Sequence, residues 1–477
     1  MSYTMKEYKF PEGFYFGSAT SALQVEGTLG DTGRAITVWD KWYEEEPEAF
    51  FNGENNAVGV DFYHRYKEDV ACMKETGHNS FRFSIAWSRL IPNPMSGEVN
   101  PKALEFYNGL IDSLIEAGIE PFVCLFHFDM PWSMQELGGW ESKEVLDYFR
   151  DFGEICFKLF GDRVNKWFTH NEPNTVIEGA YFYGFHYPKV MDFKRGMLAC
   201  YNIILSNSMI TKVFKDMRDA GELKGDAEIG MVLSLTPAYP ENPENSDDVE
   251  AARICDAFFV NGFLDPAVLG KFDPFLVDLL SKYDAVPETT TEELKLIAEN
   301  TVEFLGFNYY FPRRVKHKEG ADKLTSISKP EDLYGEYVLE NRRFNADRGW
   351  EIYPEAIYDM LIRLKNDYGN PRVYIGENGI GRHKGDESDM DEFGVVQDNA
   401  RIEFVKDHLK CAHRAIEEGS NCVGYHMWAT MDNWSMSNAY KNRYGFIYID
   451  RENNLERRIK KSGYWLKEIV KNNGFSE

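Results

Sequence analysis

The sequence lacks the paired cysteines that a disulfide framework or a structural zinc site would need. It holds seven cysteines, an odd number, which are widely spaced and form no Cys-x-x-Cys motif. Disulfide-stapled secreted domains and zinc sites are recognised by even numbers or by closely spaced pairs. We therefore expect reduced thiols, no bound metal, and a cytoplasmic protein.

Long hydrophobic runs and positive charge are also scarce. No uninterrupted apolar stretch of 18 residues occurs, and residues 1–14 contain no apolar core of a signal peptide, so neither a membrane span nor a secretion signal is predicted. The 53 Lys and Arg are outnumbered by 78 Asp and Glu, and the net charge is −25. Such a surface repels polyanions, so we expect neither nucleic acid nor a membrane as a partner. The one basic run, RRIKK at 457–461, is interpreted as a solvated approach to the last helix.

No low-complexity tract, internal repeat or Pro/Ser-rich linker divides the chain, although its 477 residues exceed the length of a common domain. Hydrophobic residues make up 43% of it, which is enough for one large core. Barrels of alternating strands and helices reach this length when their loops carry insertions. We therefore expect residues 1–477 to form a single domain.

Eight short apolar runs rich in β-forming residues are present, with helix-like stretches between them. These runs are FYFGSAT (14–20), SFRFSI (80–85), PFVCLF (121–126), KWFTHN (166–171), IGMVLSL (229–235), FLGFNYY (304–310), VYIGENG (373–379) and VGYHMWA (423–429). Residues 100–118 and 399–419 have apolar residues at helical spacing, and each stretch ends at a glycine. Eight such alternations predict an α/β fold, the closed parallel (β/α)8 TIM barrel.

An open, doubly wound sheet is the alternative architecture for this alternation. The first strand is not followed by a Gly-x-Gly-x-x-Gly turn, and no Gly-x4-Gly-Lys-Ser/Thr motif occurs. Glycine-rich loops of these kinds hold nucleotide phosphates in many open sheets. Their absence favours the barrel, and we expect no cofactor.

Polar side chains gather where the predicted strands end. In a parallel barrel all carboxyl ends of the strands meet at one mouth, where function collects. The candidates at this mouth are Gln24, Arg82, His127, Asp129, Asn171, Glu172, Asn308, Tyr310, Glu377 and Trp428. Glu172 and Glu377 are therefore expected to face each other, in positions where a carboxylate is rarely buried without a partner or a task.

Two carboxyl groups in an aromatic-walled cleft are what hydrolysis of a glycosidic bond requires. One protonates the leaving group while the other attacks or stabilises an oxocarbenium-like carbon, and neither step needs a metal. The nucleophile must be kept ionised by a cation and hydrogen bonds, for which Arg82 and Tyr310 are available. Three alternatives stay open. Trp428 or Tyr310, taken singly, is better explained as ordinary barrel core. His127 with Asp129 could be a metal pair, and Arg82 could neutralise an interior acid.

Seven segments, taken in order, carry a resemblance to a known family. They are FYFGSATSALQVEG (14–27), FRFSIAWSRL (81–90), HFDMPW (127–132), THNEPN (169–174), GFNYY (306–310), GWEIYPE (349–355) and YIGENG (374–379). Together they resemble glycoside hydrolase family 1, the retaining β-glucosidase family. The resemblance extends over nearly the whole chain.

This resemblance implies roles for the residues at matching positions. Glu172 would be the general acid/base, and Glu377 the nucleophile that forms a glycosyl-enzyme. Support for the nucleophile would come from Arg82, Asn308 and Tyr310. The sugar site would be formed by Gln24, His127, Asn171 and Trp428, with Trp350 as a stacking wall for the leaving group.

Three positions depart from the commonest pattern of that family. Gly376 stands before the nucleophile where threonine is usual, and Phe128 follows His127 where tryptophan is usual; both are expected to be tolerated. In DNWSMSNAYKNRYGF (432–446), Ser435 replaces a glutamate that grips the 4- and 6-hydroxyls of the sugar. The exchange removes a charge that would repel phosphate and opens space beside O6, which favours a 6-substituted sugar.

The 6-phospho-β-glycosidases of the family have a serine at this position, followed by a lysine and a tyrosine two residues apart. Ser435 and Tyr444 match this pattern, but Asn442 stands at the position of the lysine. Lys441 and Arg443 flank it as candidate phosphate contacts. In an extended segment neighbours point in opposite directions, so neither replaces the lysine unless the loop is reoriented.

Several functions therefore stay open. The missing lysine favours a neutral β-glucosidase with an enlarged sugar site, because a phosphate dianion with too few donors is costly to bury. A 6-phospho-β-glucosidase with a rearranged phosphate site is the alternative, and a non-catalytic sugar-binding protein is a third that the presence of both glutamates disfavours. Retention of configuration would require carboxyl groups about 5 to 5.5 Å apart. The partner expected is a small-molecule glucoside, and assembly into a homo-oligomer is left open.

Overall fold

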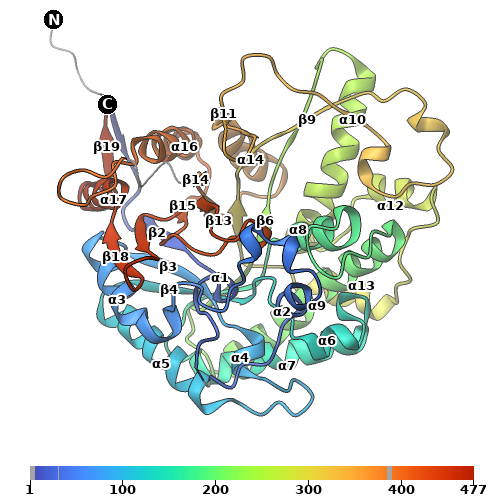
Figure 1. Cartoon of the computed structure of the whole chain (residues 1–477). Coiled ribbons are helices and arrows are strands. Elements are labelled where there is room, and N and C mark those ends of the chain that lie inside the picture. Colours follow the sequence, from blue (N-terminus) through green and yellow to red (C-terminus); the bar gives the residue numbers. More distant parts are fainter. Residues whose placement is uncertain (1–5, 31, 384–388) are drawn as a thin grey trace, which may run out of the picture.

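Eight parallel strands close into a ring at the centre of the computed structural model, which describes residues 6–30, 32–383 and 389–477 (Figure 1). The strands are β2 (Tyr15–Ala19), β3 (Ser80–Ser84), β4 (Glu120–Phe126), β5 (Lys166–Asn171), β6 (Glu228–Ser234), β8 (Phe304–Asn308), β13 (Arg372–Asn378) and β15 (Cys422–Trp428). Each pairs with its neighbour in this order, and β15 pairs with β2 to close the barrel. The predicted (β/α)8 architecture is confirmed.

All eight predicted runs coincide with barrel strands, and their ends differ by no more than two residues. The largest difference is in β8, which ends at Asn308, so Tyr310 follows the strand rather than lying within it. The predicted helices at 100–118 and 399–419 are also confirmed, as α5 (Pro101–Glu116) and α16 (Asn399–Glu417).

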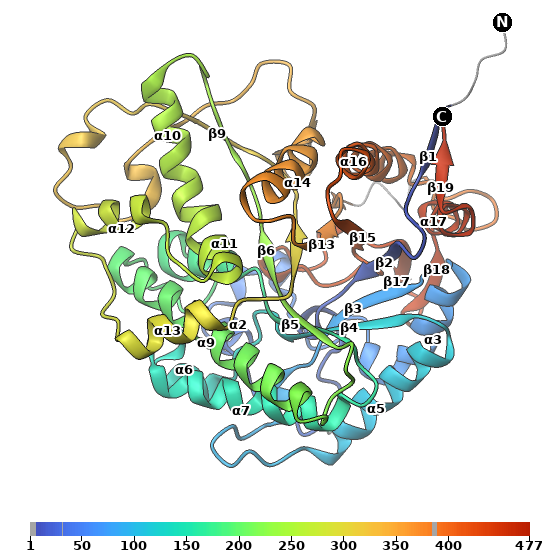
Figure 2. The same ribbon diagram turned by 180° about the vertical axis from the view of Figure 1, so that it is seen from behind.

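Helices cover the outside of the barrel and lie around the strands in both views (Figures 1 and 2). The remaining helices of eight residues or more are α2 (Val38–Glu45), α3 (Phe62–Glu75), α7 (Lys143–Phe160), α9 (Phe193–Asp219), α10 (Ser246–Asp256), α12 (Pro274–Ser281), α13 (Thr291–Glu299), α14 (Glu355–Asp367) and α17 (Lys461–Asn472). In α5, Asn100 accepts a hydrogen bond from the Lys102 amide (3.1 Å) and Pro101 takes the first helical position. The buried face of α5 repeats at helical spacing, and consists of Ala103, Phe106, Tyr107, Leu110, Ile111 and Leu114.

Shorter elements form the loops. The short helices are α1 (Ala22–Val25), α4 (Trp87–Leu90), α6 (Trp132–Glu136), α8 (Pro173–Ile177) and α11 (Gly262–Leu264). The 3₁₀ turns are η1 (Pro47–Ala49), η2 (Phe51–Gly53), η3 (Gly139–Glu141), η7 (Ala321–Lys323), η8 (Pro330–Asp332) and η9 (Met436–Asn438), and the π-helical turns are η4 (Glu178–Tyr183), η5 (Ala257–Asn261) and η6 (Asp265–Leu269). The strands outside the barrel are β1 (Glu7–Lys9), β7 (Ala238–Pro240), β9 (Arg313–Lys316), β10 (Gly335–Glu336), β11 (Phe344–Asn345), β12 (Trp350–Glu351), β14 (Arg382–His383), β16 (Asn442–Arg443), β17 (Ile447–Asp450), β18 (Glu456–Ile459) and β19 (Gly474–Ser476).

The inside of the barrel is filled by side chains. A cluster of fully buried residues consists of Phe122, Cys124, Phe168, Val232, Phe304 and Tyr374. The rings of Phe122 and Tyr374 meet edge to face at 5.0 Å between centroids, and those of Phe168 and Phe304 at 4.9 Å. The barrel is therefore a packed core rather than a pore, and a substrate can enter only at its mouth.

Helix α9 is the only described helix that is long and apolar enough, by composition, to cross a membrane. However, 72% of its most apolar window is buried within the fold. It packs against α7, so its hydrophobic residues belong to the core.

The interpretation of the basic run at 457–461 as solvated is wrong for two of its four basic residues. Arg457 donates to both carboxylate oxygens of the buried Asp69, each at 3.0 Å. Burial raises the pKa of Asp69 to about 6, and the Arg457 guanidinium opposes that rise. Lys460 is fully buried and pairs with Asp432 at 3.0 Å. This run passes through the interior before α17, which a count of charges in the sequence does not reveal.

The two ends of the described chain meet on one side of the barrel. Strands β1 and β19 pair in antiparallel fashion, with Glu7 opposite Ser476 (Figure 1). All seven cysteines are free, as the sequence predicts, and none of them is fully exposed.

Candidate active site

Glu172 stands at the point where β5 turns into α8. The ladder between β5 and β6 is irregular from Phe168 to Asn171, and the Glu172 amide donates to the carbonyl of Val232 at 2.8 Å. Glu172 has a φ of 46°, a left-handed conformation that is unusual for a residue other than glycine and is concentrated at functional sites. Pro173 follows at the first helical position. This turn leaves Glu172 8% exposed at the mouth.

Glu377 lies near the end of β13, beside a second irregularity. The register of β13 against β8 shifts between Ile375 and Glu377, at Gly376. A Cβ atom on Gly376 would lie 2.7 Å from Oδ1 of Asn308, closer than real Cβ contacts come. The glycine therefore lets the strand pass against Asn308 while Glu377 turns into the barrel.

The Glu377 carboxylate is held by two donors, one within β3 and one just after β8. Tyr310 donates its hydroxyl to Oε2 at 2.5 Å, and Arg82 forms an ion pair with Oε1. Arg82 is fully buried in β3, so its charge acts at short range with little screening by water. Both sequence-predicted partners of Glu377 therefore lie where they were expected.

Asn171 and Asn308 link the two glutamates. Asn308 donates its Nδ2 to Oε1 of Glu172 at 2.9 Å and to Oδ1 of Asn171 at 3.1 Å. Arg82 donates its Nη1 to the same Asn171 oxygen at 3.0 Å. One continuous network of hydrogen bonds thus joins Glu172, Asn308, Asn171, Arg82 and Glu377.

The electrostatic settings of the two carboxyl groups differ. Burial raises the pKa of Glu172 to about 7, and the negative charge of Glu377 adds to this rise against the Asn308 hydrogen bond. Glu377 is instead ion-paired with Arg82. One carboxyl group is thus suited to hold a proton near neutral pH, and the other is placed to carry a negative charge.

The same network defines the tautomer of His127. Because Oδ1 of Asn171 accepts from Arg82, which can only donate, Nδ2 of Asn171 must donate to Nε2 of His127, at 3.0 Å. The proton of the neutral imidazole is then on Nδ1, which is buried and has no hydrogen-bond partner among the described residues. Burial lowers the pKa of His127 well below its usual value, with Arg82 adding to the effect. His127 therefore presents an unused N–H donor.

Aromatic rings form the walls of the mouth. His127 and Trp428 stack with centroids 5.9 Å apart, and Trp428 packs with Tyr310 and Tyr444. Trp350 lies 5.6 Å from Tyr310 between centroids. Such rings supply flat apolar faces for a sugar and its leaving group.

Gln24 lies in the first loop of the mouth. Its Nε2 donates to the carbonyl of Trp434 at 2.8 Å, and its Oε1 accepts from the Ser21 hydroxyl at 2.8 Å. Gln24 therefore sits beside the residue that precedes Ser435.

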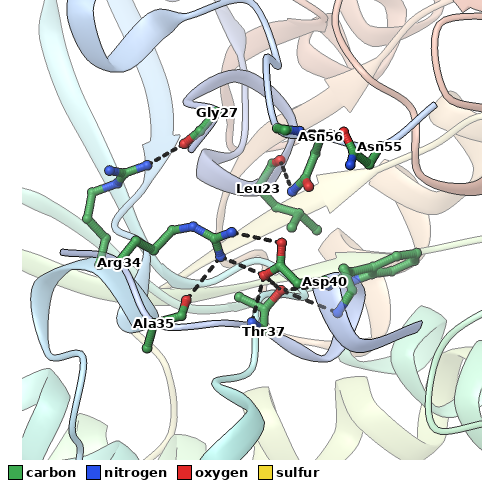
Figure 3. A network of polar contacts seen from close by, with 11 residues as sticks. Leu23, Gly27, Arg34, Ala35, Thr37, Asp40, Asn55 and Asn56 are labelled. Carbon is green, nitrogen blue, oxygen red and sulfur yellow. Dashed lines mark hydrogen bonds and ion pairs between the residues drawn. The ribbon is translucent and has the colours of Figure 1, made fainter. Parts of the chain in front are cut away.

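A polar network steadies this first loop (Figure 3). Arg34 donates to both oxygens of Asp40, each at 2.8 Å, and Thr37 caps α2 together with Asp40. Asn56 donates to the carbonyl of Leu23, next to Gln24, at 3.1 Å. A loop held at these points keeps Gln24 in place.

The segment after β15 carries the residues expected near O6. Ser435 is partly buried, and its amide donates to the carbonyl of Ala439 at 2.7 Å. Asn442 is buried, and neither amide atom of its side chain has a hydrogen-bond partner within the described residues. The Lys441 ammonium lies 5.4 Å from the Phe51 ring centroid, and the Arg443 guanidinium lies 5.2 Å from that of Tyr448. Both flanking cations thus pack on aromatic rings.

Asp129 is buried beside His127 and remains the least explained candidate. Its Oδ1 accepts from the His127 amide at 3.4 Å, and burial raises its pKa to about 7. The metal-site alternative requires further ligands, and residues 6–30, 32–383 and 389–477 contain no group of three His, Cys, Asp or Glu side chains suited to a metal.

Arg348 is a site residue that sequence reasoning missed. It belongs to the turn between β11 and β12, and its guanidinium carbon lies 4.2 Å from the ring centroid of Trp350. The only signal in the sequence is a cation two residues before Trp350 in the segment ADRGWE.

Comparisons with known proteins agree over the whole length. The family model of glycosyl hydrolase family 1 matches residues 6–475. The 6-phospho-beta-glucosidase GmuD of Bacillus subtilis is 49% identical over 470 residues, which cover 98% of this chain and 99% of that protein. Beta-glucosidase A of Acetivibrio thermocellus is 36% identical over 471 residues, with coverage of 99% and 100%. The structure of a family 1 β-glucosidase from Thermotoga maritima matches with a TM-score of 0.89 at 34% identity, covering 99% of this chain and 100% of that one.

Proposed function

Because this chain belongs to glycosyl hydrolase family 1 and is therefore a glycoside hydrolase, we propose that it cleaves β-glucosides by double displacement at Glu172 and Glu377. The observation that carries this proposal is the network that joins a buried carboxyl group of raised pKa to an ion-paired one. The relatives reported above carry the names of enzymes, so they give no support to the alternative of a non-catalytic sugar-binding protein.

In the first step the Glu377 carboxylate attacks C1 of the sugar, and the bond from C1 to the leaving oxygen breaks. Glu172 gives its proton to that oxygen, so the leaving group departs as a neutral alcohol. Arg82 and Tyr310 hold the nucleophile in place before the attack, and Asn308 orients Glu172.

In the second step Glu172, now a carboxylate, takes a proton from a water molecule, whose oxygen attacks C1. The bond between C1 and Glu377 breaks, which restores both carboxyl groups to their starting states. Two inversions at C1 give retention of configuration. The free Nδ1–H of His127 is a donor for a hydroxyl of the sugar in both steps.

We further propose that the sugar carries a phosphate at O6. The support is the 49% identity to a 6-phospho-β-glucosidase, against 36% to a β-glucosidase, together with Ser435 and Tyr444 at the two matching positions. Serine supplies a hydroxyl donor where a glutamate would repel the dianion. A phosphorylated sugar, which does not cross membranes freely, also suits the cytoplasmic location that we propose for this protein.

A neutral glucoside is the second candidate, and one observation favours it. Asn442 occupies the position of the lysine, and a buried carboxamide suits hydroxyl groups better than a dianion. In this case Ser435 would mark an enlarged site for a sugar with a neutral substituent at O6.

A comparison of kcat/KM for an aryl β-glucoside and for its 6-phosphate, with the purified protein, decides between the two. We expect the phosphate to be preferred. Ser435→Glu should then lower kcat/KM for the phosphate by about 100-fold or more and spare the neutral glucoside, because a carboxylate close to the phosphate repels it. A wild-type preference for the neutral glucoside would contradict the proposed phosphate.

A further inference from the structure

A phosphate at O6 needs a positive charge that β16 does not supply. A dianion leaving water requires charged donors, and a neutral serine, tyrosine and asparagine leave it undercompensated. Asn442 stands where a lysine would be, and its neighbours Lys441 and Arg443 alternate to the other side of the extended segment, where they lie over Phe51 and Tyr448. The positive charge that the phosphate needs must therefore come from a cation on another element of the fold.

The turn between β11 and β12 borders this region. Asn345 pairs with Trp350 across the hairpin, and its carbonyl accepts from the Arg348 and Gly349 amides at 3.2 and 2.7 Å. The Asn345 side chain donates to the carbonyl of Gly381 at 2.9 Å, which fastens the turn to the chain that follows β13.

Gly381 in turn lies directly against Tyr444. A Cβ atom on Gly381 would come within 2.4 Å of the Tyr444 ring, so the backbone and the ring are in close contact. The turn that carries Arg348 therefore contacts Gly381, and Gly381 in turn contacts the ring of Tyr444. Trp350, on the same hairpin, lies 5.6 Å from Tyr310, which donates to Glu377.

Among the described residues, no carboxylate forms an ion pair with the guanidinium of Arg348. Its guanidinium carbon lies over the Trp350 ring, 4.2 Å from the centroid, and its Nε is shielded from solvent without a hydrogen-bond partner among the described residues. The neighbouring cations differ, because Arg343 is ion-paired with Asp407 and Arg382 with Asp347. Within residues 6–30, 32–383 and 389–477, no such ion pair of Arg348 occurs.

The electrostatics of Tyr444 agree with this placement. Burial raises the pKa of Tyr444, and Arg348 is the cation that opposes this rise most, ahead of Arg401. The Arg348 guanidinium thus acts on the hydroxyl of Tyr444, which is one of the two side chains matched to phosphate binding.

We propose that Arg348 is the phosphate-binding cation of this site, a specificity residue that takes over the task of the lysine absent at position 442. This inference rests on the proposed 6-phosphate substrate. A planar guanidinium presents two parallel N–H donors to a phosphate, and its stacking on Trp350 holds the plane fixed before the substrate arrives. The charge then comes from the hairpin over the mouth instead of from β16.

The test compares Arg348→Met with Arg343→Met, a matched control on the same hairpin whose guanidinium is ion-paired elsewhere. For Arg348→Met we expect kcat/KM on the aryl 6-phosphoglucoside to fall by about 10- to 100-fold, the effect of losing a charged hydrogen-bonded partner. The neutral aryl glucoside should change by no more than about 3-fold, within the ordinary scatter of such effects. Arg343→Met should leave both substrates unaffected.

Binding without turnover gives a second readout. Glucose 6-phosphate should inhibit hydrolysis of the neutral glucoside, and its inhibition constant should rise in Arg348→Met while that of glucose stays constant. Asn442→Lys in the Arg348→Met background should restore a large part of the lost activity on the phosphate. No rescue would mean that Arg348 and position 442 do not face the same anion, and would overturn the inference.

The other outcomes are equally distinct. Equal losses on the phosphorylated and neutral substrates would show that Arg348 acts only on Trp350 and the leaving group, and no loss on either would place the phosphate elsewhere. Either result overturns the inference about Arg348 but does not contradict the proposed 6-phosphate substrate. If the wild-type protein itself does not use the 6-phosphate, the proposed function fails first.

Discussion

Glu172 and Glu377 are the same residue type a short distance apart, and only their surroundings separate their proposed roles. The position of each could be predicted from the sequence, because each ends a strand that the apolar pattern identifies. The raised pKa of Glu172 could not be predicted from the sequence, because it depends on burial and on the charge of Glu377, which lies 205 positions away in the chain.

The pKa of Glu172 leads to a pH prediction. Glu172 must be protonated to act as an acid, so kcat/KM for a substrate with a poor leaving group should be lost as the pH rises through about 7. A pH profile of kcat/KM measures this directly. A basic limb that persists in Glu172→Gln, assayed with an activated phenol, would assign it to another group.

The choice of leaving group tests the same residue independently. Glu172→Ala should lower kcat/KM for a poor leaving group by about 100- to 10,000-fold, and affect a dinitrophenyl leaving group far less, because the latter needs little protonation. Losses of equal size on both would contradict the role of Glu172 as acid.

Arg348, Arg457 and Lys460 show where residue-level prediction fails. Each is a cation whose function depends on what the tertiary fold brings beside it: Tyr444, the buried Asp69 and Asp432 respectively. A charged residue in a polar stretch of sequence looks solvated unless its distant partner is known.

Among the elements, the barrel strands were predicted and the outer strands were not. A buried parallel strand is a continuous apolar run of five to seven residues, which stands out in the sequence. Strands β11, β12, β14 and β16 have two residues each, too few for any period, and form only because the loops at the mouth pack together.

The irregularity in β13 gives a prediction at the scale of the strand. Threonine is usual at position 376 in the family, and the sequence alone suggests that glycine is a tolerated exchange. In this fold a Cβ there would lie 2.7 Å from Asn308 and 3.2 Å from Arg82. Gly376→Ala should therefore displace both side chains and lower kcat for every substrate by about 10-fold or more, since small misplacements of catalytic groups are costly.

The control for this variant is Gly225→Ala, in an exposed turn where the added methyl group meets no atom within 4 Å. It should leave kcat and the melting temperature unchanged. If Gly376→Ala kept full activity, the close packing of Gly376 against Asn308 and Arg82 would not be needed for catalysis.

On the scale of the whole molecule, the pairing of β1 with β19 leads to a prediction about thermal stability that can be tested separately from catalysis. β1 leads into the amino end of β2, opposite the mouth of the barrel. Deleting residues 474–477 removes this pairing and the ion pair of Glu477 with Lys406. We expect the melting temperature to fall by a few degrees, and kcat/KM at 25 °C to be unchanged.

Calorimetry of this deletion has a matched control in Glu477→Gln, which loses the ion pairs but keeps the strand. The intact chain should unfold in one cooperative transition if residues 1–477 form a single domain, which remains a prediction. A deletion that lowers kcat/KM as much as stability would mean that the terminal strands also influence the mouth.

The contact between β1 and β19 has a further consequence for how the chain is ordered. The barrel closes in space between β15 and β2, and the polypeptide nearly closes too, because Glu7 lies opposite Ser476 in one sheet and Lys6 and Glu477 exchange two backbone hydrogen bonds. The succession of strands is in effect cyclic, and a short covalent bridge between the two ends would allow the chain to be opened at another surface loop. The order in which the eight barrel strands follow one another around the ring would be unchanged by such an opening.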